Sequence, residues 1–366
     1  METTHHLIHF RDARQLAPVA DDSVDLVLTS PPYPMVRMWD DLFARQDPDI
    51  LADIEALRGQ EAFEGMHRIL DAVWHECIRV LKPGALACIN VGDAVRTLDN
   101  RFGLYPNHAR ILTALTSAGL TALPLILWRK QTNAPNKFMG SGMLPAGAYV
   151  TLEHEYILIF RKGPKRAFPT DQEREIRRQS ALFWEERNLW FSDIWTDLKG
   201  TGQELASTTT RKRSGAFPFE LAYRLIQMFS VKGDTVMDPF AGTGTTLFAA
   251  MSSGRHSIGF EVEPGLHASI VSGIGRTKTT ANQRIAQRLA DHMAFVEARF
   301  LNRSDAAYFN HHYGFPVVTG QETDLLFNPV RRIRKNGGTS FEVEYLSEPI
   351  LNPERYEQPS LFDNIR

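Results

Sequence analysis

Short apolar runs alternate with amphipathic stretches along most of the chain. Short runs bounded by turn residues are typical of strands buried in a parallel sheet. Seven such strands are predicted: Leu7–Phe10, Asp25–Thr29, Ala85–Asn90, Leu123–Trp128, Glu155–Arg161, Thr235–Asp238 and Ser257–Glu261. Because helical stretches separate them, we expect an α/β fold whose sheet carries helices on both faces.

Three stretches have the hydrophobic spacing of helices. The clearest runs from Ala62 to Leu81, where apolar residues recur every three or four positions and share one face. Pro83-Gly84 follows it, and both residue types end helices. Further helices are predicted over Pro218–Ser230 and about Ala281–Phe300, the second after the last strand.

Three other regions show no sustained periodicity of hydrophobic residues. Residues 131–150 are rich in Gly, Pro and Asn and predict a long mobile loop. Residues 163–214 mix charged, aromatic and hydroxyl side chains. The tail beyond 301 is similarly irregular and contains the basic run RRIRK at 331–335.

Composition narrows the class of protein without deciding it. The 366 residues are 43% hydrophobic and 23% charged, enough for one large core and an accessory lobe. The two cysteines, Cys77 and Cys88, favour a reducing compartment over a disulfide framework. No apolar run has membrane-spanning length and METTHHLIHF is not a secretory signal, so we expect a soluble cytoplasmic protein with no membrane contact.

The charged and metal-ligating residues do not narrow the function further. The net charge of −2 neither indicates nor excludes nucleic acid, because a local basic surface decides that binding. His5-His6 and His311-His312 lack a spaced partner of the His-Glu-x-x-His kind, so no metal site is expected.

The strand at Asp25–Thr29 runs into Ser30-Pro31-Pro32-Tyr33, an unusual end for a buried strand. Proline has no backbone N–H and presses the residue before it into extended geometry, so the strand must stop at Ser30. A stiff turn follows, with a hydroxyl on one side and an aromatic ring on the other. An isolated tetrapeptide of this kind is more often an ordinary loop, but its place after an apolar strand favours a functional turn.

The segment GDTVMDPFAGTGTT at 233–246 is the second motif. A strand ends at Asp238, and Gly242 and Gly244 permit a tight turn and close backbone approach to a ligand before a helix begins near Thr245. Glu261, at the end of the next strand, is placed to accept hydrogen bonds from ribose hydroxyls. The alternative is a strand–helix turn without a ligand. The absence of a lysine after the second glycine argues against a phosphate-binding loop.

TSPPY at 29–33 and DPFAGTGTT at 238–246 together resemble the DNA amino-methyltransferases that use S-adenosylmethionine. The resemblance covers most of 7–263, but neither 164–213 nor 301–366. Since the catalytic turn precedes the cofactor loop, the chain resembles the circularly permuted β group of these enzymes. Methyltransferases that modify protein glutamine or ribosomal guanine tend to carry Asn-Pro-Pro-Tyr, with the cofactor loop first.

The resemblance implies a seven-stranded, mostly parallel Rossmann-like sheet, circularly permuted, with an inserted target-recognition region and a C-terminal extension. It implies a catalytic half at 1–162, which includes a helical insertion at 35–82 and the loop at 131–150. A target-recognition region at 163–214 and a cofactor-binding half at 215–300 follow. The extension at 301–366 has no assigned role.

The cofactor implied by the resemblance is S-adenosylmethionine. The family's binding positions carry over to Asp12, Phe217, Pro218, Asp238, Pro239, Phe240, Gly242, Thr243, Gly244 and Glu261. An acid at Asp12 would face the adenine amino group of the cofactor, although a turn or helix-cap aspartate is about as common. The histidine that many members carry before Phe217-Pro218 is replaced here by Ser214-Gly215-Ala216.

The catalytic residues implied are Ser30, Pro31, Pro32 and Tyr33. A nucleobase amine is a poor nucleophile because its lone pair is delocalised into the ring. Acceptors aimed at both N–H bonds, here the Ser30 hydroxyl and the Pro31 carbonyl, would free that pair for direct attack. Tyr33 offers a face on which an extruded base stacks, worth ~1–3 kcal/mol. Asp93 in NVGDA is a candidate for the base pocket, with an ordinary turn acid as the alternative.

Serine rather than aspartate before the prolines is similar to the N4-cytosine enzymes, so we expect a sequence-specific DNA methyltransferase acting on cytosine N4. An N6-adenine enzyme is the first alternative. A non-catalytic nucleic-acid-binding module and an RNA or protein methyltransferase are the others.

Double-stranded DNA is the implied partner. Candidate phosphate contacts are Lys137, Arg211, Lys212 and Arg213, with the basic run at 331–335 as a second group. Short basic runs are often simply solvated faces. The resemblance also implies functional pairing with a restriction endonuclease, and homodimers are common in the family.

Overall fold

The structure, a computed structural model, describes residues 3–130, 139–200, 217–300 and 306–349. Its centre is a ten-stranded sheet of order β10-β6-β9-β3-β2-β11-β12-β1-β16-β15. In that order the strands are Ile194–Trp195, Thr121–Arg129, His154–Arg161, Leu81–Val91, Val24–Thr29, Thr235–Asp238, His256–Glu261, Thr3–Phe10, Ser340–Tyr345 and Val330–Lys335.

The seven predicted strands form an unbroken run from β6 to β1, which confirms the predicted α/β fold. Strands β3, β2, β11, β12 and β1 are parallel, whereas β9 is antiparallel to both β3 and β6. Because β9 is reversed, its first residues lie at the edge of the sheet where the parallel strands end.

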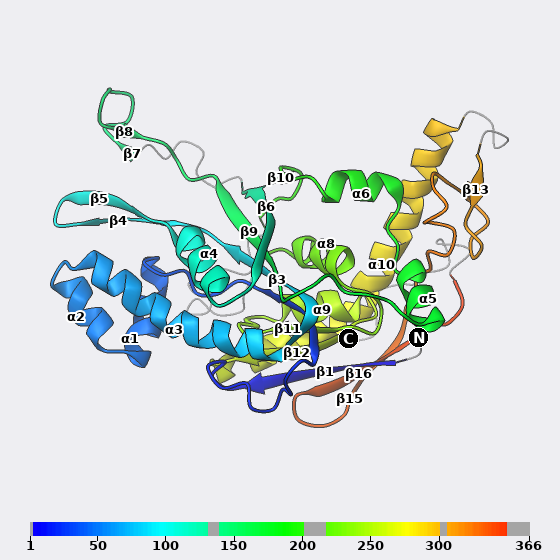
Figure 1. Cartoon of the computed structure of the whole chain (residues 1–366), viewed down its shortest axis with the longest axis horizontal. Coiled ribbons are helices and arrows are strands. Elements are labelled where there is room, and N and C mark those ends of the chain that lie inside the picture. Colours follow the sequence, from blue (N-terminus) through cyan, green and yellow to red (C-terminus); the bar gives the residue numbers. More distant parts are fainter. Residues whose placement is uncertain (1–2, 131–138, 201–216, 301–305, 350–366) are drawn as a thin grey trace, which may run out of the picture.

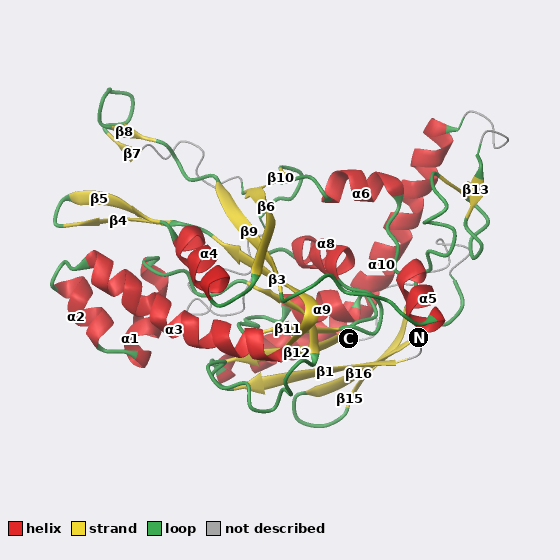
Figure 2. Cartoon of the chain, viewed as in Figure 1, coloured by secondary structure: helices red, strands yellow, loops and turns green. Residues whose placement is uncertain are grey.

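Helices cover both faces of the sheet (Figure 2). Side chains of β2 alternate between the two faces, with Val27 in the core beneath α3 and α4 and with Leu26 and Leu28 in the core beneath α8. The described helices are α1 (Asp40–Gln46), α2 (Asp49–Glu55), α3 (Gly59–Val80), α4 (Asn107–Ser117), α5 (Asp171–Gln179), α6 (Trp184–Trp190), α8 (Phe219–Phe229), α9 (Thr245–Met251) and α10 (His267–Arg299), with 3₁₀ turns η1 (Arg37–Trp39) and η2 (Pro264–Leu266).

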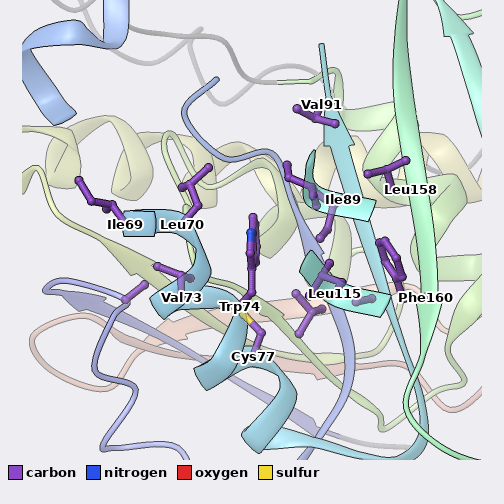
Figure 3. Close-up of a cluster of buried hydrophobic side chains, with 14 of the residues drawn as sticks. Ile69, Leu70, Val73, Trp74, Cys77, Ile89, Val91, Leu115, Leu158 and Phe160 are labelled. Carbon is purple, nitrogen blue, oxygen red and sulfur yellow. The ribbon is translucent and has the colours of Figure 1, made fainter. Parts of the chain in front are cut away.

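Helix α3 is the predicted amphipathic helix. Its apolar face, which includes Leu70, Val73 and Trp74, points toward β3 and β9 (Figure 3). The helix begins at Gly59 and ends at Val80, and β3 starts at the next residue. The helix therefore stops before Pro83, which lies within the strand.

Helix α10 starts 14 residues earlier than the predicted Ala281, at His267. The segment between these residues contains glycine, serine and threonine, which have low helix propensity. Ile270 and Ile274 are nevertheless buried against the sheet together with residues of α9. Tertiary packing outweighs propensity here, so the predicted start was wrong.

The tail beyond 301 was predicted to be irregular, and that prediction was wrong for residues 330–345. Strand β16 carries buried Phe341, Val343 and Tyr345 at alternate positions and pairs with β1. The RRIRK run is β15, the edge strand of the sheet, where it exposes its basic side chains. Charged residues on an edge strand hinder pairing with other chains.

The region from 163 is ordered as far as it is described. It contributes α5, α6 and β10, and the side chains of Trp190 and Trp195 are buried against the sheet. Two hairpins project from the body (Figure 1): β4–β5, formed by Ala94–Leu98 and Arg101–Tyr105, and β7–β8, formed by Met139–Gly140 and Ala148–Tyr149. The second lies within the predicted loop at 131–150, so part of that loop has regular structure. A further hairpin pairs β13 (Tyr308–Phe309) with β14 (Pro316–Val317).

Across the described residues, no helix combines the length and apolar character needed to cross a bilayer.

Candidate active site

A cavity of about 590 Å³ opens at the edge of the sheet where the parallel strands end. Its walls come from the turn after β2, the turn after β11, the residues that follow β12, and helix α1. Ser30, Pro31, Pro32 and Tyr33 all line it, as do most of the residues in the glycine-rich turn. The two sequence motifs therefore form one site.

The Asp238 side chain links the two motifs through hydrogen bonds. The Thr29 hydroxyl, 209 positions away, donates to Oδ1 of Asp238 at 2.6 Å, and the Thr246 hydroxyl donates to Oδ2 at 2.6 Å. The backbone N–H of Phe240 donates to Oδ1 at 3.0 Å. Because Asp238 is almost fully buried, desolvation raises its pKa to about 6, although these three hydrogen bonds act in the opposite direction. The side chain joins β2 to the turn after β11.

Glu261 and Gly242 line the side of the cavity away from the Ser-Pro-Pro-Tyr turn. The backbone N–H of Gly242 donates to Oε2 of Glu261 at 2.8 Å, and that of Glu263 donates to Oε1 at 2.8 Å. Burial raises the pKa of Glu261, against the lowering effect of these backbone hydrogen bonds. Gly242 has φ +53°, and a Cβ there would meet only the Phe240 carbonyl oxygen, at 3.9 Å. A fixed carboxylate beside an open glycine backbone fits the ribose of a nucleoside-containing ligand.

Gly244 has a different role from Gly242. It does not line the cavity, and a Cβ on it would lie 2.9 Å from the Phe248 ring. Its φ of +90° and the hydrogen bond from its N–H to the Ala241 carbonyl form the tight turn that starts α9. Pro218 also lies outside the lining, at the N-cap of α8, whereas its neighbour Phe217 lines the cavity.

Tyr33 is the centre of a hydrogen-bond network at the other end of the cavity. Its hydroxyl lies 3.0 Å from Oγ of Ser30, donates to Oε2 of Glu155 at 3.1 Å and accepts from Nδ2 of Asn90 at 3.0 Å. Asn90 also donates to Glu155 Oε2 at 2.6 Å, and Lys130 donates to Oε1 at 2.9 Å. Burial and the nearby Glu155 charge raise the pKa of Tyr33, so the phenol keeps its proton.

The single phenol proton fixes the direction of these bonds. If Tyr33 donates to Glu155, its oxygen has two lone pairs left, and the N–H of Asn90 and the O–H of Ser30 occupy both. The Ser30 hydroxyl is then a donor toward Tyr33, and its own lone pairs stay available as acceptors. The network thus turns Ser30 into an acceptor, as the predicted chemistry requires.

Asp12 lines the cavity near the end of β1 and is held by Arg14. The Arg14 guanidinium donates to Oδ2 of Asp12 at 2.9 and 2.7 Å, and the Arg14 backbone N–H donates to Oδ1 at 2.8 Å. Burial raises the pKa of Asp12, but the hydrogen bonds and charge of Arg14 outweigh it and lower the pKa. Asp12 is therefore an ionised acceptor on the side of the cavity that Glu261 also lines.

Comparison with known proteins identifies the family of the chain. The N6_N4_Mtase family model, described as DNA methylase, matches residues 24–272, more than half of the chain. The chain belongs to this DNA methylase family. The Type II methyltransferase M.MthZI of Methanothermobacter thermautotrophicus is 47% identical over 362 residues, covering 99% of each protein.

Two further relatives support the assignment of the chain to this methylase family. M.MjaI of Methanocaldococcus jannaschii, also a Type II methyltransferase, is 46% identical over 285 residues, 75% of this chain and 92% of the relative. The structure of TTHA0409 from Thermus thermophilus, solved in complex with S-adenosyl-L-methionine, is 35% identical with a TM-score of 0.58. It covers 74% of this chain, and this chain covers 95% of it.

The predicted site residues of the methylase mostly meet in the cavity. The lining includes all four predicted catalytic residues and eight of the predicted cofactor residues: Asp12, Phe217, Asp238, Pro239, Phe240, Gly242, Thr243 and Glu261. Asp93 is not among the lining residues. Its carboxylate accepts hydrogen bonds from the backbone and ring of His108, so the turn-acid alternative is correct.

Glu155, Asn90 and Lys130 were missed in the sequence. Glu155 and Lys130 line the cavity, and Asn90 binds Tyr33 directly. Helix α1, which supplies Phe43 and neighbouring side chains to the lining, was also missed as part of the site. Lys137, Arg211, Lys212 and Arg213, the predicted DNA contacts, lie outside the described residues. Within the described ranges, no cluster of His, Cys, Asp and Glu has the arrangement of a metal site.

Proposed function

We propose that this methylase transfers a methyl group from S-adenosylmethionine to the exocyclic N4 of cytosine in double-stranded DNA. One observation carries the proposal. The Ser-Pro-Pro-Tyr turn, which suits an amino group, and the glycine turn with Glu261, which suits a nucleoside, line the same cavity.

The cofactor assignment is supported by the relative TTHA0409, which was solved with S-adenosyl-L-methionine. In this chain, Glu261 would accept hydrogen bonds from the ribose, and the open backbone at Gly242 lets the ligand approach. Asp12 would accept from the adenine amino group. The bound cofactor supplies an electrophilic methyl group on sulfonium.

The protein's own part in the reaction is to orient and polarise the target amine. The base leaves the duplex at a cost of a few kcal/mol and stacks on Tyr33. The Ser30 hydroxyl, held as an acceptor by Tyr33, and the Pro31 carbonyl accept the two N–H bonds of the amine. Asp238 keeps the two motifs in fixed relation, so the amine and the methyl group are aligned.

Serine at position 30 supports cytosine N4 over adenine N6, by resemblance to the N4-cytosine enzymes. Nucleoside analysis tests the choice. DNA incubated with the methylase and labelled cofactor is digested to nucleosides, and the labelled product is identified by mass. N4-methylcytosine is the expected product, whereas N6-methyladenine would reverse the choice and no labelled base would refute DNA methylation.

Recognition of a specific sequence and pairing with a restriction endonuclease are also proposed, because two relatives are named Type II methyltransferases. We place target recognition in residues 163–214 and phosphate contacts at Lys137 and Arg211–Arg213. Sequencing that detects modified bases in DNA from cells expressing the methylase would give the site, and random methylation would contradict the proposal.

A further inference from the structure

The catalytic turn of this methylase lacks a carboxylate, but the cavity brings one to it. Position 30 is serine, whose hydroxyl accepts a hydrogen bond but does not hold a proton lost by an amine at neutral pH. Glu155 stands near the start of β9, opposite Trp128 of β6, and reaches the turn because β9 runs antiparallel to its neighbours.

Glu155 contacts Tyr33, whereas three other carboxylates of the lining have partners elsewhere. Asp238 is held by two threonines and a backbone N–H, and Glu261 is held by two backbone N–H groups on the opposite wall. Asp12 is held by Arg14. Unlike Asp12, Asp238 and Glu261, Glu155 is hydrogen-bonded to the Ser-Pro-Pro-Tyr turn, through the Tyr33 hydroxyl.

Glu155 also keeps acceptor capacity for a ligand. A carboxylate has about four lone-pair sites. Tyr33 and Asn90 occupy Oε2, and Lys130 occupies one site on Oε1. One site on Oε1 is left, and the side chain, 12% exposed, borders the cavity.

The surroundings are shaped to hold this carboxylate in place. A Cβ at Gly92 would lie 3.1 Å from the Tyr33 ring and 3.4 Å from Cγ of Glu155, so glycine leaves room for both side chains. Lys130 compensates the negative charge, and Asn90, itself fully buried, orients Oε2. Glu155 is therefore held in one position beside the catalytic turn.

We propose that Oε1 of Glu155 takes the proton that the target amine loses after methyl transfer, replacing the Ser30 hydroxyl as the acceptor of that N–H bond, a role that rests on the proposed function. The amino nitrogen forms a bond to the methyl carbon as the carbon–sulfur bond breaks, with its electron pair left on sulfur. The electron pair of one N–H bond then returns to nitrogen, and its proton passes to Oε1 of Glu155. Lys130 and Asn90 are positioning residues for this carboxylate.

The test compares single-turnover methylation by the wild type, Glu155→Gln and Glu153→Gln. Glu153 is a matched control because its side chain, 44% exposed, pairs with Arg129 outside the cavity. Each protein is mixed with labelled S-adenosylmethionine and DNA free of amino-methylated bases. Loss of a general base typically costs 10²–10⁴-fold in rate, so we expect a fall of at least about 100-fold for Glu155→Gln. Glu153→Gln should be unchanged, and the Kd for the cofactor should stay within about threefold in both.

Glu155→Asp separates a chemical role from a structural one. It keeps the carboxylate but withdraws it by one methylene, so its rate should lie well above that of Glu155→Gln at equal thermal stability. If Asp is no better than Gln, or if Glu155→Gln methylates at the wild-type rate, the inference is overturned while DNA methylation stands. If Glu155→Gln does not fold, Glu155→Asn replaces it as the amide variant, and an Asn rate equal to that of Glu155→Asp overturns the inference. A wild type that methylates no DNA refutes the proposed function itself.

Discussion

Single side chains define the chemistry of this site, and Tyr33 connects most of them. Its ring lines the cavity, and its hydroxyl contacts Ser30, Asn90 and Glu155. Changes at Tyr33 should therefore affect turnover more than cofactor binding, since Glu261 and Gly242 lie on the other wall.

For Tyr33→Ala, we expect kcat to fall by roughly 5- to 150-fold from the loss of base stacking worth ~1–3 kcal/mol, and further if Ser30 loses its orientation. Tyr33→Phe keeps the stacking face and should lose less. Steady-state methylation and calorimetric cofactor binding measure the two effects. An unchanged kcat in Tyr33→Ala would show that the base does not stack there.

Glu261→Gln should weaken S-adenosylmethionine binding by roughly 10- to 100-fold, because a hydrogen bond to a charged group is worth ~1.5–3 kcal/mol. Glu55→Gln, at an exposed position on α2, is the control and should bind normally. Equilibrium dialysis with labelled cofactor gives both values of Kd. Equal affinities would remove Glu261 from the cofactor site.

Asp238 predicts a pH dependence of stability. Its pKa is about 6 in the folded protein against a usual 3.8, so between these values the folded state holds more protons than the unfolded state. Stability then falls as pH rises through that window, by up to about 3 kcal/mol. Asp238→Asn lacks this titration, so its free energy of unfolding relative to wild type should rise between pH 4 and pH 7. Parallel urea-unfolding curves across that range would contradict the assignment.

The residues that sequence reasoning found are those in local motifs. Ser30, Tyr33, Gly242 and Glu261 all lie at the carboxyl end of a parallel strand or in the turn that follows it, so the common edge of the sheet predicted their meeting. Glu155 was missed for the opposite reason: it stands at the start of a strand, and only the antiparallel pairing of β9 brings it to the site. Strand direction is a tertiary property that short periodic patterns do not encode.

At the scale of elements, α10 connects α8 with the region from 163. Its Arg288 is fully buried and makes two hydrogen bonds to Glu186 of α6, at 2.5 and 2.6 Å. The same guanidinium donates to the Tyr223 hydroxyl of α8 at 3.1 Å and lies 4.5 Å from the centre of the Phe327 ring. One side chain thus joins four segments of the chain.

Arg288→Met should destabilise the protein by about 3–5 kcal/mol, because it leaves the Glu186 carboxylate, only 12% exposed, without its partner. Adding Glu186→Gln should recover part of that loss. Arg276→Met, on an exposed face of the same helix, should change stability by less than about 0.5 kcal/mol. Urea unfolding measures all three. A small effect for Arg288→Met would mean that α6 is not held through this pair.

Local pattern predicted the elements with one dominant period, such as α3 and the central strands. It failed for the first half of α10, whose small and polar residues are helical because Ile270 and Ile274 pack beneath the sheet. It also failed for β16, although the alternation of Phe341, Val343 and Tyr345 was present in the sequence. These elements depend on partners far away in the chain.

At the scale of the whole molecule, the segment 306–349 completes the sheet. Strand β16 covers the outer edge of β1, and Tyr345 contacts Thr4 and the carbonyl of Met251 through its hydroxyl. Lys232, in the loop before β11, donates to the Leu326 carbonyl and Asn328, which connects the same segment to the central strands.

A chain ending at residue 300 should therefore expose β1 as an unpaired edge and aggregate, with loss of cofactor binding, because Asp12 lies just beyond β1. Light scattering and dialysis of the truncated protein test this. A soluble truncated chain that binds S-adenosylmethionine normally would show that the last strands are dispensable for the site.

The position of β1 between β12 and β16 also constrains how the newly made chain folds. His6 pairs with Ser257, 251 positions away, and Thr4 bonds to Tyr345, 341 positions away. Strand β1 is synthesised long before these partners and is thus among the last to find neighbours, and contacts of such long range form slowly. Until then its apolar residues stay exposed, so we expect the nascent polypeptide to bind chaperones.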